Sequence, residues 1–203
     1  MTTVSEANQL ELNQGDNFIF GVDVSASMQT EDCAGGLSRI DYLKEKTIQF
    51  AEEASKYDPD GIDVLTFGHQ VTVYEKVTAE NAKQIISKLT APEGATMTHN
   101  LIKRAWELHK AGGYPQTVLF VATDGAPSDP KAVMDVIVDI TKKVANATEF
   151  NISFLTVGVI DPSLRAYFTK LDDDLKGAVH DIVDVKALDE VDFVQAFVGA
   201  LHD

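Results

Sequence analysis

The stretch Phe18-Ile19-Phe20-Gly21-Val22-Asp23-Val24-Ser25-Ala26-Ser27-Met28 decides the fold of this chain. Its first half, residues 18–22, is apolar with no polar face, which is typical of a strand buried on both sides of a parallel sheet. Its second half places Asp23, Ser25 and Ser27 at alternate positions, so their side chains point the same way if the backbone stays extended. Carboxylate and hydroxyl oxygens suit Mg²⁺, Ca²⁺ or Mn²⁺. The stretch therefore predicts a strand that ends in a cation-binding loop, although Asp and Ser are also common in ordinary turns and helix caps.

The composition describes one acidic globular domain. The chain has 203 residues, 44% of them apolar, and carries 32 Asp and Glu against 17 Lys and Arg, a formal net charge of −15. This charge argues against nucleic-acid binding and against binding to anionic membrane surfaces. It favours cation binding in general terms, but it is also the charge of an ordinary well-solvated surface.

The ends of the chain and its cysteine content bear on its location. Residues 1–16 are polar and aperiodic, and we expect them to form a tail before a domain at 17–203. The sequence shows no signal peptide and no apolar run of membrane-spanning length. Cys33 is the only cysteine, so no intrachain disulfide can form. These features predict a cytoplasmic protein.

Apolar strand-like segments alternate with segments of helical periodicity along the chain. Strands are expected at 18–22, 62–67, 71–74, 117–123, 152–159 and 178–185. Helices are expected at 38–57, 78–90, 129–145, 162–175 and 188–201, with one more between the 91–98 loop and Gly112. The alternation predicts an α/β fold with a doubly wound, mostly parallel six-stranded sheet and helices on both faces. The tight turn at residues 68–70 predicts one antiparallel edge strand.

Oxygen-bearing side chains occur in three loops that follow a strand or open a helix. Asp23, Ser25 and Ser27 lie in the first loop, Thr96 in the second and Asp124 in the third. Ligands of open α/β sheets bind outside the carboxyl ends of the strands, where the winding direction reverses. If the first and fourth strands flank that point, the first and third loops are neighbours. A cation held mainly by hydroxyls, with carboxylates behind them, keeps an affinity for one more anion.

These motifs resemble those of a von Willebrand factor A (vWA) domain, which has a Rossmann-like fold. Its metal-ion-dependent adhesion site, or MIDAS, combines Asp-x-Ser-x-Ser, a Thr in a later loop and an Asp after the fourth strand. The similar segments here are Asp23-Val24-Ser25-Ala26-Ser27, Gly94-Ala95-Thr96 and Thr123-Asp124-Gly125, in the same order. Gly94-Ala95-Thr96 departs from the common Gly-Gly-Thr, so Thr98 is a rival ligand to Thr96.

The resemblance implies a set of roles for these residues. Ser25, Ser27 and Thr96 would contact Mg²⁺, or Mn²⁺ or Ca²⁺, through their hydroxyls, while Asp23 and Asp124 act directly or through water. The remaining position would take an Asp or Glu carboxylate from a partner protein. The chain would then be a non-enzymatic interaction module, similar to the intracellular bacterial vWA proteins of tellurite-resistance or chaperone-ATPase systems.

Two other functions remain open. The first is a metal-dependent phosphohydrolase or phosphotransferase with Asp23 as the nucleophile. That enzyme would need a second Asp at position 25 and a basic group for the phosphate, but Ser25 stands there and none of the three loops contains Lys or Arg. The second is a scaffold whose metal site is vestigial.

Overall fold

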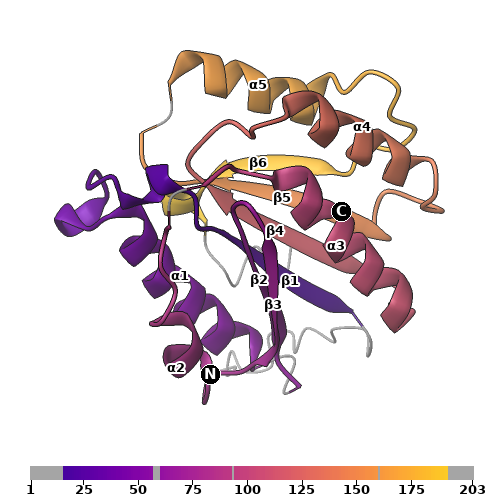
Figure 1. Ribbon diagram of the computed structural model, residues 1–203. Helices are drawn as coiled ribbons and strands as arrows, with labels where there is room; N and C mark the ends of the chain where they lie inside the picture. The colour runs from indigo at the N-terminus through magenta and orange to yellow at the C-terminus, as the bar shows by residue number, and fades with distance from the viewer. Residues whose placement is uncertain (1–15, 57–59, 93, 160, 192–203) are drawn as a thin grey trace, which may run out of the picture.

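Six strands form one mixed sheet in the order β3-β2-β1-β4-β5-β6 (Figure 1). The strands are β1 (Asn17–Asp23), β2 (Ile62–Phe67), β3 (Val71–Val77), β4 (Thr117–Thr123), β5 (Phe150–Thr156) and β6 (Val183–Ala187). β3 runs antiparallel to β2 at one edge, and the other pairs are parallel. β1 pairs with β2 on one side and β4 on the other, which places the reversal of winding beside β1. The predicted fold class is confirmed.

The structure, a computed structural model, describes residues 16–191 except 57–59, 93 and 160. The predicted tail up to residue 15 and residues 192–201 of the predicted last helix lie outside the described residues. Within the described ranges, none of the helices has the length and apolar character to span a bilayer.

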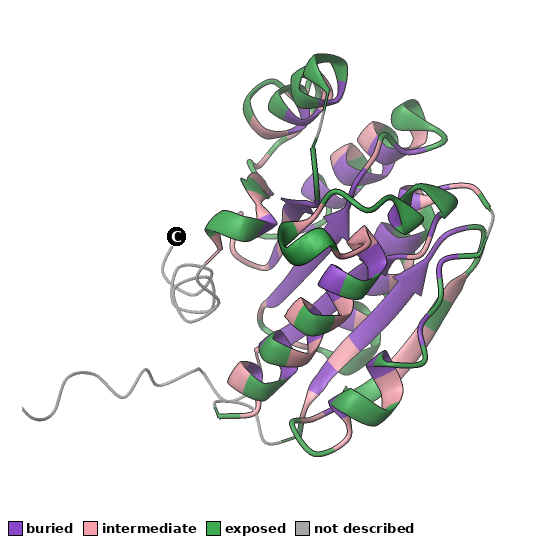
Figure 2. Cartoon of the chain, turned by 90° about the vertical axis from the view of Figure 1, so that its left-hand side faces the viewer, coloured by how far each residue is buried: buried purple, intermediate pink, exposed green. Residues whose placement is uncertain are grey.

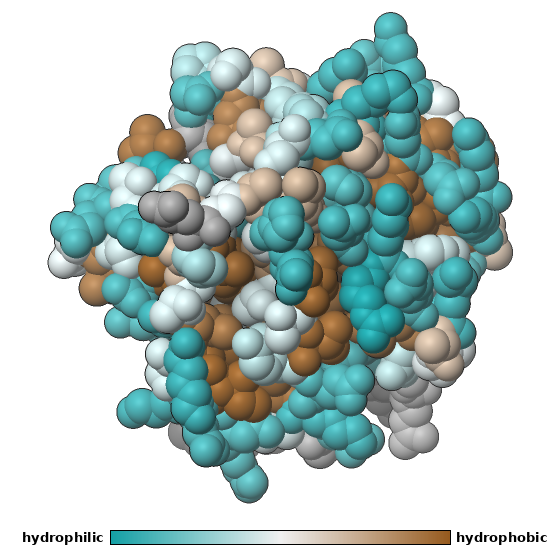
Figure 3. Space-filling model, viewed as in Figure 1, coloured by the Kyte–Doolittle hydropathy of each residue, from teal (hydrophilic) through white to brown (hydrophobic). Residues whose placement is uncertain are grey.

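Helices cover both faces of the sheet (Figure 1). They are α1 (Arg39–Ala54), α2 (Ala82–Ile86), α3 (Thr98–Gly112), α4 (Pro130–Thr141) and α5 (Pro162–Asp173), with short 3₁₀ helices at Ala26–Gln29, Ala34–Gly36 and Leu188–Glu190. α1 and α2 pack on one face, whereas α3, α4 and α5 pack on the other. Figure 2 shows buried residues concentrated on the strands and on the helix sides that face them. The surface in Figure 3 is largely hydrophilic, with smaller apolar areas between the polar side chains.

The apolar run of β1 supplies both cores, because its side chains alternate between the two faces of the sheet. Phe18 and Phe20 belong to the core under α1, and Ile19 belongs to the core under α3. The Phe50 ring lies 4.6 Å from Phe20 and 5.0 Å from Phe120 between ring centroids, which anchors α1 over β1 and β4. Gly21 lets α3 come close, since a Cβ there would lie 2.6 Å from Leu101 Cδ2. The central strands are therefore buried on both sides, as predicted.

Three helices differ in how closely they match their predicted bounds. Ser38 Oγ accepts the Asp41 N–H at 3.2 Å, which starts α1 where the capping pattern predicted. α2 is shorter than the predicted 78–90, because Asn81 Oδ1 accepts the Thr78 N–H at 2.9 Å and holds residues 78–81 in a turn. α4 ends at Thr141 rather than at 145.

The last strand was predicted at the wrong place. β6 covers Val183–Ala187 rather than 178–185. Pairing with β5 begins at Ile152 and Val183, whereas residues 178–182 follow a turn at Gly177, whose φ is 90°. Val179 in that segment is 62% exposed, so its apolar character did not signal a buried strand.

Candidate metal centre

Asp23 ends β1 and is fully buried, with 0% of its surface exposed. Its Oδ1 accepts the Ser25 N–H at 2.8 Å, and its Oδ2 accepts the Thr123 hydroxyl at 2.6 Å. Burial raises the pKa of Asp23 to about 6, against the lowering effect of these donors, and the nearby Asp124 carboxylate adds to the rise. The site therefore holds a carboxylate whose negative charge is costly without a compensating cation.

The Ser25 and Ser27 hydroxyls and the Asp124 carboxylate lie in one chain of contacts. Ser25 Oγ is 3.2 Å from Ser27 Oγ, and the Ser27 hydroxyl donates to Asp124 Oδ1 at 2.8 Å. The sequence argument assumed an extended backbone through Ser27, but this holds only as far as Ser25. The 3₁₀ helix Ala26–Gln29 follows and turns the chain, and Ser27 then bonds to the loop after β4.

Thr96 is joined to the loop after β4 by its backbone. Its N–H donates to Ser128 Oγ at 3.0 Å, and its carbonyl accepts the Ser128 N–H at 3.0 Å. Both Thr96 and the rival ligand Thr98, the first residue of α3, are buried. Within the described part of the chain, no hydrogen bond joins the Thr96 side chain to the other four predicted ligands. The structure thus brings Asp23, Ser25, Ser27 and Asp124 into contact and ties the Thr96 loop to their edge of the sheet.

Arg39 is a member of this cluster that the sequence argument missed. It is the first residue of α1, and its Nη1 donates to Asp124 Oδ2 at 2.7 Å. Its Nε and Nη2 donate to the two carboxylate oxygens of Asp32 at 2.8 and 2.6 Å. The sequence argument looked for Lys and Arg only in the three ligand loops, whereas Arg39 reaches the site from the start of α1. The one signal was that α1 follows the first loop and so must begin at the same edge.

Thr123 and Ser128 were also missed. Thr123 holds Asp23 through its hydroxyl, and Ser128 connects the second and third loops. Thr123 stands next to Asp124 in the quoted motif, and a buried hydroxyl at a strand end could have been assigned a partner. Ser128 has no comparable signal in the sequence.

The oxygen donors fit a small hard cation. Adjacent ligands of octahedral Mg²⁺, each about 2.1 Å from the metal, are about 3 Å apart. The separations of 3.2 Å between Ser25 and Ser27 and 2.8 Å between Ser27 and Asp124 are close to this value. No group of three or more His, Cys, Asp or Glu placed to hold a metal occurs among the described residues. The donors available here are hydroxyls with supporting carboxylates, which suits Mg²⁺ or Mn²⁺ better than zinc.

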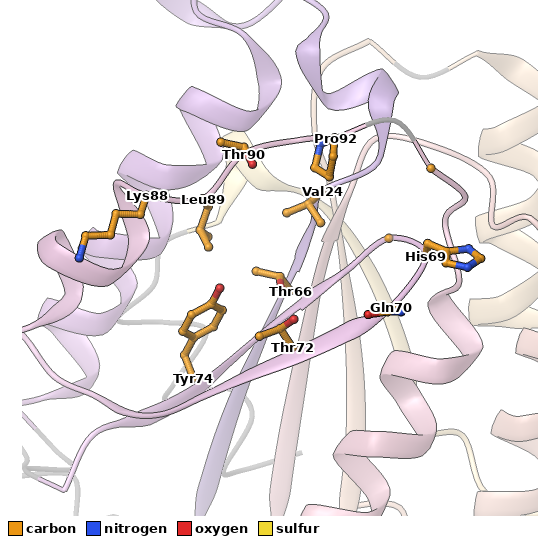
Figure 4. Close-up of a pocket in the computed structure, with 12 residues that line it drawn as sticks. Val24, Thr66, His69, Gln70, Thr72, Tyr74, Lys88, Leu89, Thr90 and Pro92 are labelled. Carbon is orange, nitrogen blue, oxygen red and sulfur yellow. The ribbon is translucent and has the colours of Figure 1, made fainter.

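A hollow of about 350 Å³ lies beside the cluster, between the β2–β3 hairpin and the loop that follows α2 (Figure 4). Val24 and Gly94 line it, and both are neighbours of predicted ligands in sequence. Figure 4 shows Tyr74 directing its hydroxyl toward the hollow, whereas the amine of Lys88 points outward. None of the five predicted ligands lines the hollow. It is therefore a neighbour of the candidate centre and not the centre itself.

Several solved structures share this fold. The D319A mutant of the PilB minor pilin from Streptococcus sanguinis superposes with a TM-score of 0.68 at 12% identity, covering 95% of this chain and 62% of the pilin. The manganese-loaded TRAP protein of Plasmodium vivax gives 0.63 at 12% identity, covering 92% of this chain and 74% of that one. The SpRpn10 VWA domain gives 0.55 at 15% identity, covering 90% and 94%. At these identities the likeness concerns the fold alone.

The sequence itself also matches a family model. No curated protein sequence matches the chain significantly. The model of the von Willebrand factor type A domain matches residues 18–126, more than half of the chain, from the start of β1 to just beyond Asp124. Domains of this family often mediate protein–protein interactions. The chain belongs to the von Willebrand factor type A domain family.

Proposed function

We propose that the chain is a protein-interaction module that binds Mg²⁺ or Mn²⁺ and, through the cation, an Asp or Glu carboxylate of a partner protein. Ser25, Ser27 and Thr96 hold the cation through their hydroxyls in this proposal. Asp23 and Asp124 act directly or through water. The proposed setting is the cytoplasm. Disulfides are rare there, and this chain, with Cys33 as its single cysteine, has no intrachain disulfide.

The spacing of the Ser25, Ser27 and Asp124 oxygens is the observation that carries the proposal. Ser27 and Asp124 are 97 residues apart, yet Ser27 Oγ lies 2.8 Å from Asp124 Oδ1, and Ser25 Oγ lies 3.2 Å from Ser27 Oγ in the same loop. Hydroxyl protons bridge these oxygens. A cation would replace the bridging interactions without requiring the loops to move far. The manganese in the TRAP structure, which shares the fold, supports the same choice of metal.

The chain's own residues would leave the cation with much of its charge. Only two carboxylates, Asp23 and Asp124, belong to the proposed ligand set, and Asp124 is paired with Arg39. A bound divalent cation supplies positive charge at the surface of the loops. Because the hydroxyl ligands are neutral, this charge is available to a carboxylate from outside.

The environment of Asp23 argues against the phosphotransfer alternative. A nucleophilic carboxylate needs an accessible oxygen. Asp23 is fully buried, and each of its oxygens accepts a hydrogen bond, one from Ser25 and one from Thr123. This arrangement suits a residue that supports other ligands. We therefore propose a non-enzymatic role.

Calorimetric titration of the full chain with Mn²⁺ tests the metal site. We expect binding that is lost or strongly weakened in Ser27→Ala. Ser163→Ala is the matched control, because it removes an exposed hydroxyl that donates to Asp161 at the start of α5. Absence of Mn²⁺ and Mg²⁺ binding by the folded wild-type protein would contradict the proposal and favour a vestigial site.

A capture experiment from the native source tests the interaction. The immobilised chain should retain a partner in Mg²⁺ or Mn²⁺ and release it in EDTA. Ser27→Ala should fail to retain the same protein, whereas Ser163→Ala should retain it. A partner that binds equally well in EDTA would show that recognition does not pass through a cation.

A further inference from the structure

Arg39 holds the face of Asp124 that points away from the serine hydroxyls. Its Nη1 contacts Asp124 Oδ2 at 2.7 Å, while Ser27 donates to Oδ1 of the same carboxylate. The Asp124 side chain is fully buried, and the Arg39 side chain is only 11% exposed. With Oδ2 already engaged, Asp124 offers one oxygen toward the serines, and it cannot bind a cation there through both oxygens.

Asp32 fixes the orientation of Arg39 from the opposite side. The guanidinium meets both Asp32 carboxylate oxygens in a two-pronged contact, at 2.8 and 2.6 Å. Such a paired contact restricts a guanidinium more than a single bond does. The hydrogen bonds that Arg39 donates to Asp32, and then the one it donates to Asp124, raise the pKa of Arg39 above its already high value. Arg39 is therefore a permanent positive charge in a set position.

The loop after β5 is shaped around this pair. A Cβ at Gly158 would lie 2.5 Å from Arg39 Nε and 2.8 Å from Asp32 Oδ1, and the φ of Gly158 is 70°. The Val159 N–H also approaches Asp32 Oδ2 at 3.4 Å. Arg39 thus connects the loops that follow β1, β4 and β5 at one edge of the sheet.

The charge of Arg39 opposes that of a bound cation. A positive charge in contact with one of two ligand carboxylates weakens the attraction of this chain for the metal. The same positive charge strengthens the attraction of the loaded site for an incoming anion. The two affinities should therefore change in opposite directions when the charge near Asp124 is altered.

We propose that Arg39 is a positioning residue, which engages Oδ2 of Asp124, leaves Oδ1 facing the serines and offsets the negative charge of this carboxylate. As a result, the chain binds its cation weakly, and the loaded site binds a partner carboxylate strongly. This inference rests on the proposed metal site. Asp32 has the opposite influence on the two affinities, because it partly neutralises the charge of Arg39. It strengthens cation binding and weakens the binding of the partner carboxylate. A purely structural ion pair would instead weaken both affinities together when broken.

Three variants of the full chain test the inference, each titrated with Mn²⁺ and then, when loaded, with acetate as the carboxylate probe. Arg39→Gln should bind Mn²⁺ on the order of tenfold more tightly and acetate several-fold more weakly. Asp32→Asn should show the reverse, with a smaller change because Asp32 is 25% exposed. Arg39→Lys keeps the charge, so its Mn²⁺ affinity should stay within about threefold of wild type.

Arg104→Gln is the control for a general change in net charge, since Arg104 pairs with Glu107 on the exposed side of α3. It should leave both affinities unchanged. Circular dichroism in EDTA establishes that each variant folds. If Arg39→Gln does not fold, the opposite shifts of Asp32→Asn and the retained Mn²⁺ affinity of Arg39→Lys still decide the question.

The outcomes separate this inference from the proposed function. Wild-type binding of Mn²⁺ without opposite shifts in the variants would overturn the role of Arg39 and leave the metal site standing. If Arg39→Gln binds Mn²⁺ and the wild type does not, the proposed function is overturned. The same result would support the inference that the charge of Arg39 weakens cation binding. Absence of Mn²⁺ binding in every folded variant would overturn both.

Discussion

Replacing Asp23 with Asn should stabilise the metal-free protein at neutral pH. Asp23 is fully buried, and burial raises its pKa from 3.8 to about 6. A difference of about 2 pKa units corresponds to about 3 kcal/mol of folding free energy. Asn nearly matches the shape of Asp, and its carbonyl can accept the Ser25 N–H while its amide donates to Thr123. The variant therefore removes the cost of ionisation and retains two hydrogen bonds.

The sign of the pH dependence follows from the raised pKa. The contribution of Asp23 to stability is fully present below the unfolded pKa near 3.8 and is lost as the pH rises through the folded pKa near 6. Between pH 5 and pH 7.5 the wild-type protein should lose roughly 1 to 2 kcal/mol through this group. The advantage of Asp23→Asn over wild type should grow by the same amount.

Urea unfolding in EDTA at pH 5 and pH 7.5, followed by circular dichroism, measures this difference. Other titrating groups act equally in both proteins and cancel. They include Asp172, whose pKa burial and neighbouring carboxylates raise to about 6, and His109, whose pKa burial lowers. At pH 7.5, Mn²⁺ at 100 times its dissociation constant should stabilise the wild type by about 3 kcal/mol and the variant far less.

A parallel pH dependence of the two proteins in EDTA would refute the reasoning. It would show that Asp23 does not become harder to ionise on folding. An equal gain from Mn²⁺ in both proteins would remove Asp23 from the ligand set while leaving its burial unquestioned.

Two substitutions and one reactivity measurement test the fold and the surroundings of the site. Phe50→Ala should cost about 3 to 5 kcal/mol in urea unfolding, because the fully buried ring joins α1 to β1 and β4. Gly158→Ala should lower the melting temperature, since a φ of 70° costs a non-glycine residue about 1 to 2 kcal/mol and the new Cβ collides with Arg39. An unchanged melting temperature would contradict this geometry. Cys33 should react with dithiobis-nitrobenzoate more slowly than free cysteine at pH 7.5, because burial and then the Asp32 and Asp189 carboxylates raise the pKa of its thiol. A reaction as fast as that of free cysteine would contradict the raised pKa.

Much of the fold follows from local patterns in the sequence. The apolar run before Asp23 predicted a doubly buried strand, because no polar residue interrupts it, and β1 is that strand. Ser38 with Asp41 predicted the start of α1, and the turn at 68–70 predicted the antiparallel β3. These signals depend on residues a few positions apart, so the sequence displays them directly. The domain limits at 17–203 stay a prediction.

Contacts between distant segments were decided by the tertiary structure. The start of β6 depends on its pairing with Ile152 of β5, and the apolar residues at 178–182 gave no sign that they lie outside the sheet. The proposed ligands Asp23, Ser25, Ser27, Thr96 and Asp124 were identified from their motifs, and their role in metal binding stays a prediction.

The sequence alone determined which oxygen-bearing side chains follow the ends of the strands, since the strands and the loop motifs can be inferred from it. The tertiary structure decided the charge around them. Arg39 reaches Asp124 across 85 positions, and Thr123 reaches Asp23 across 100. The sequence carries only general signals for Arg39 and Thr123 and does not identify their partners, because each contact results from the packing of α1 and β4 against β1. The affinity of the proposed centre therefore depends on side-chain contacts that only the folded chain creates.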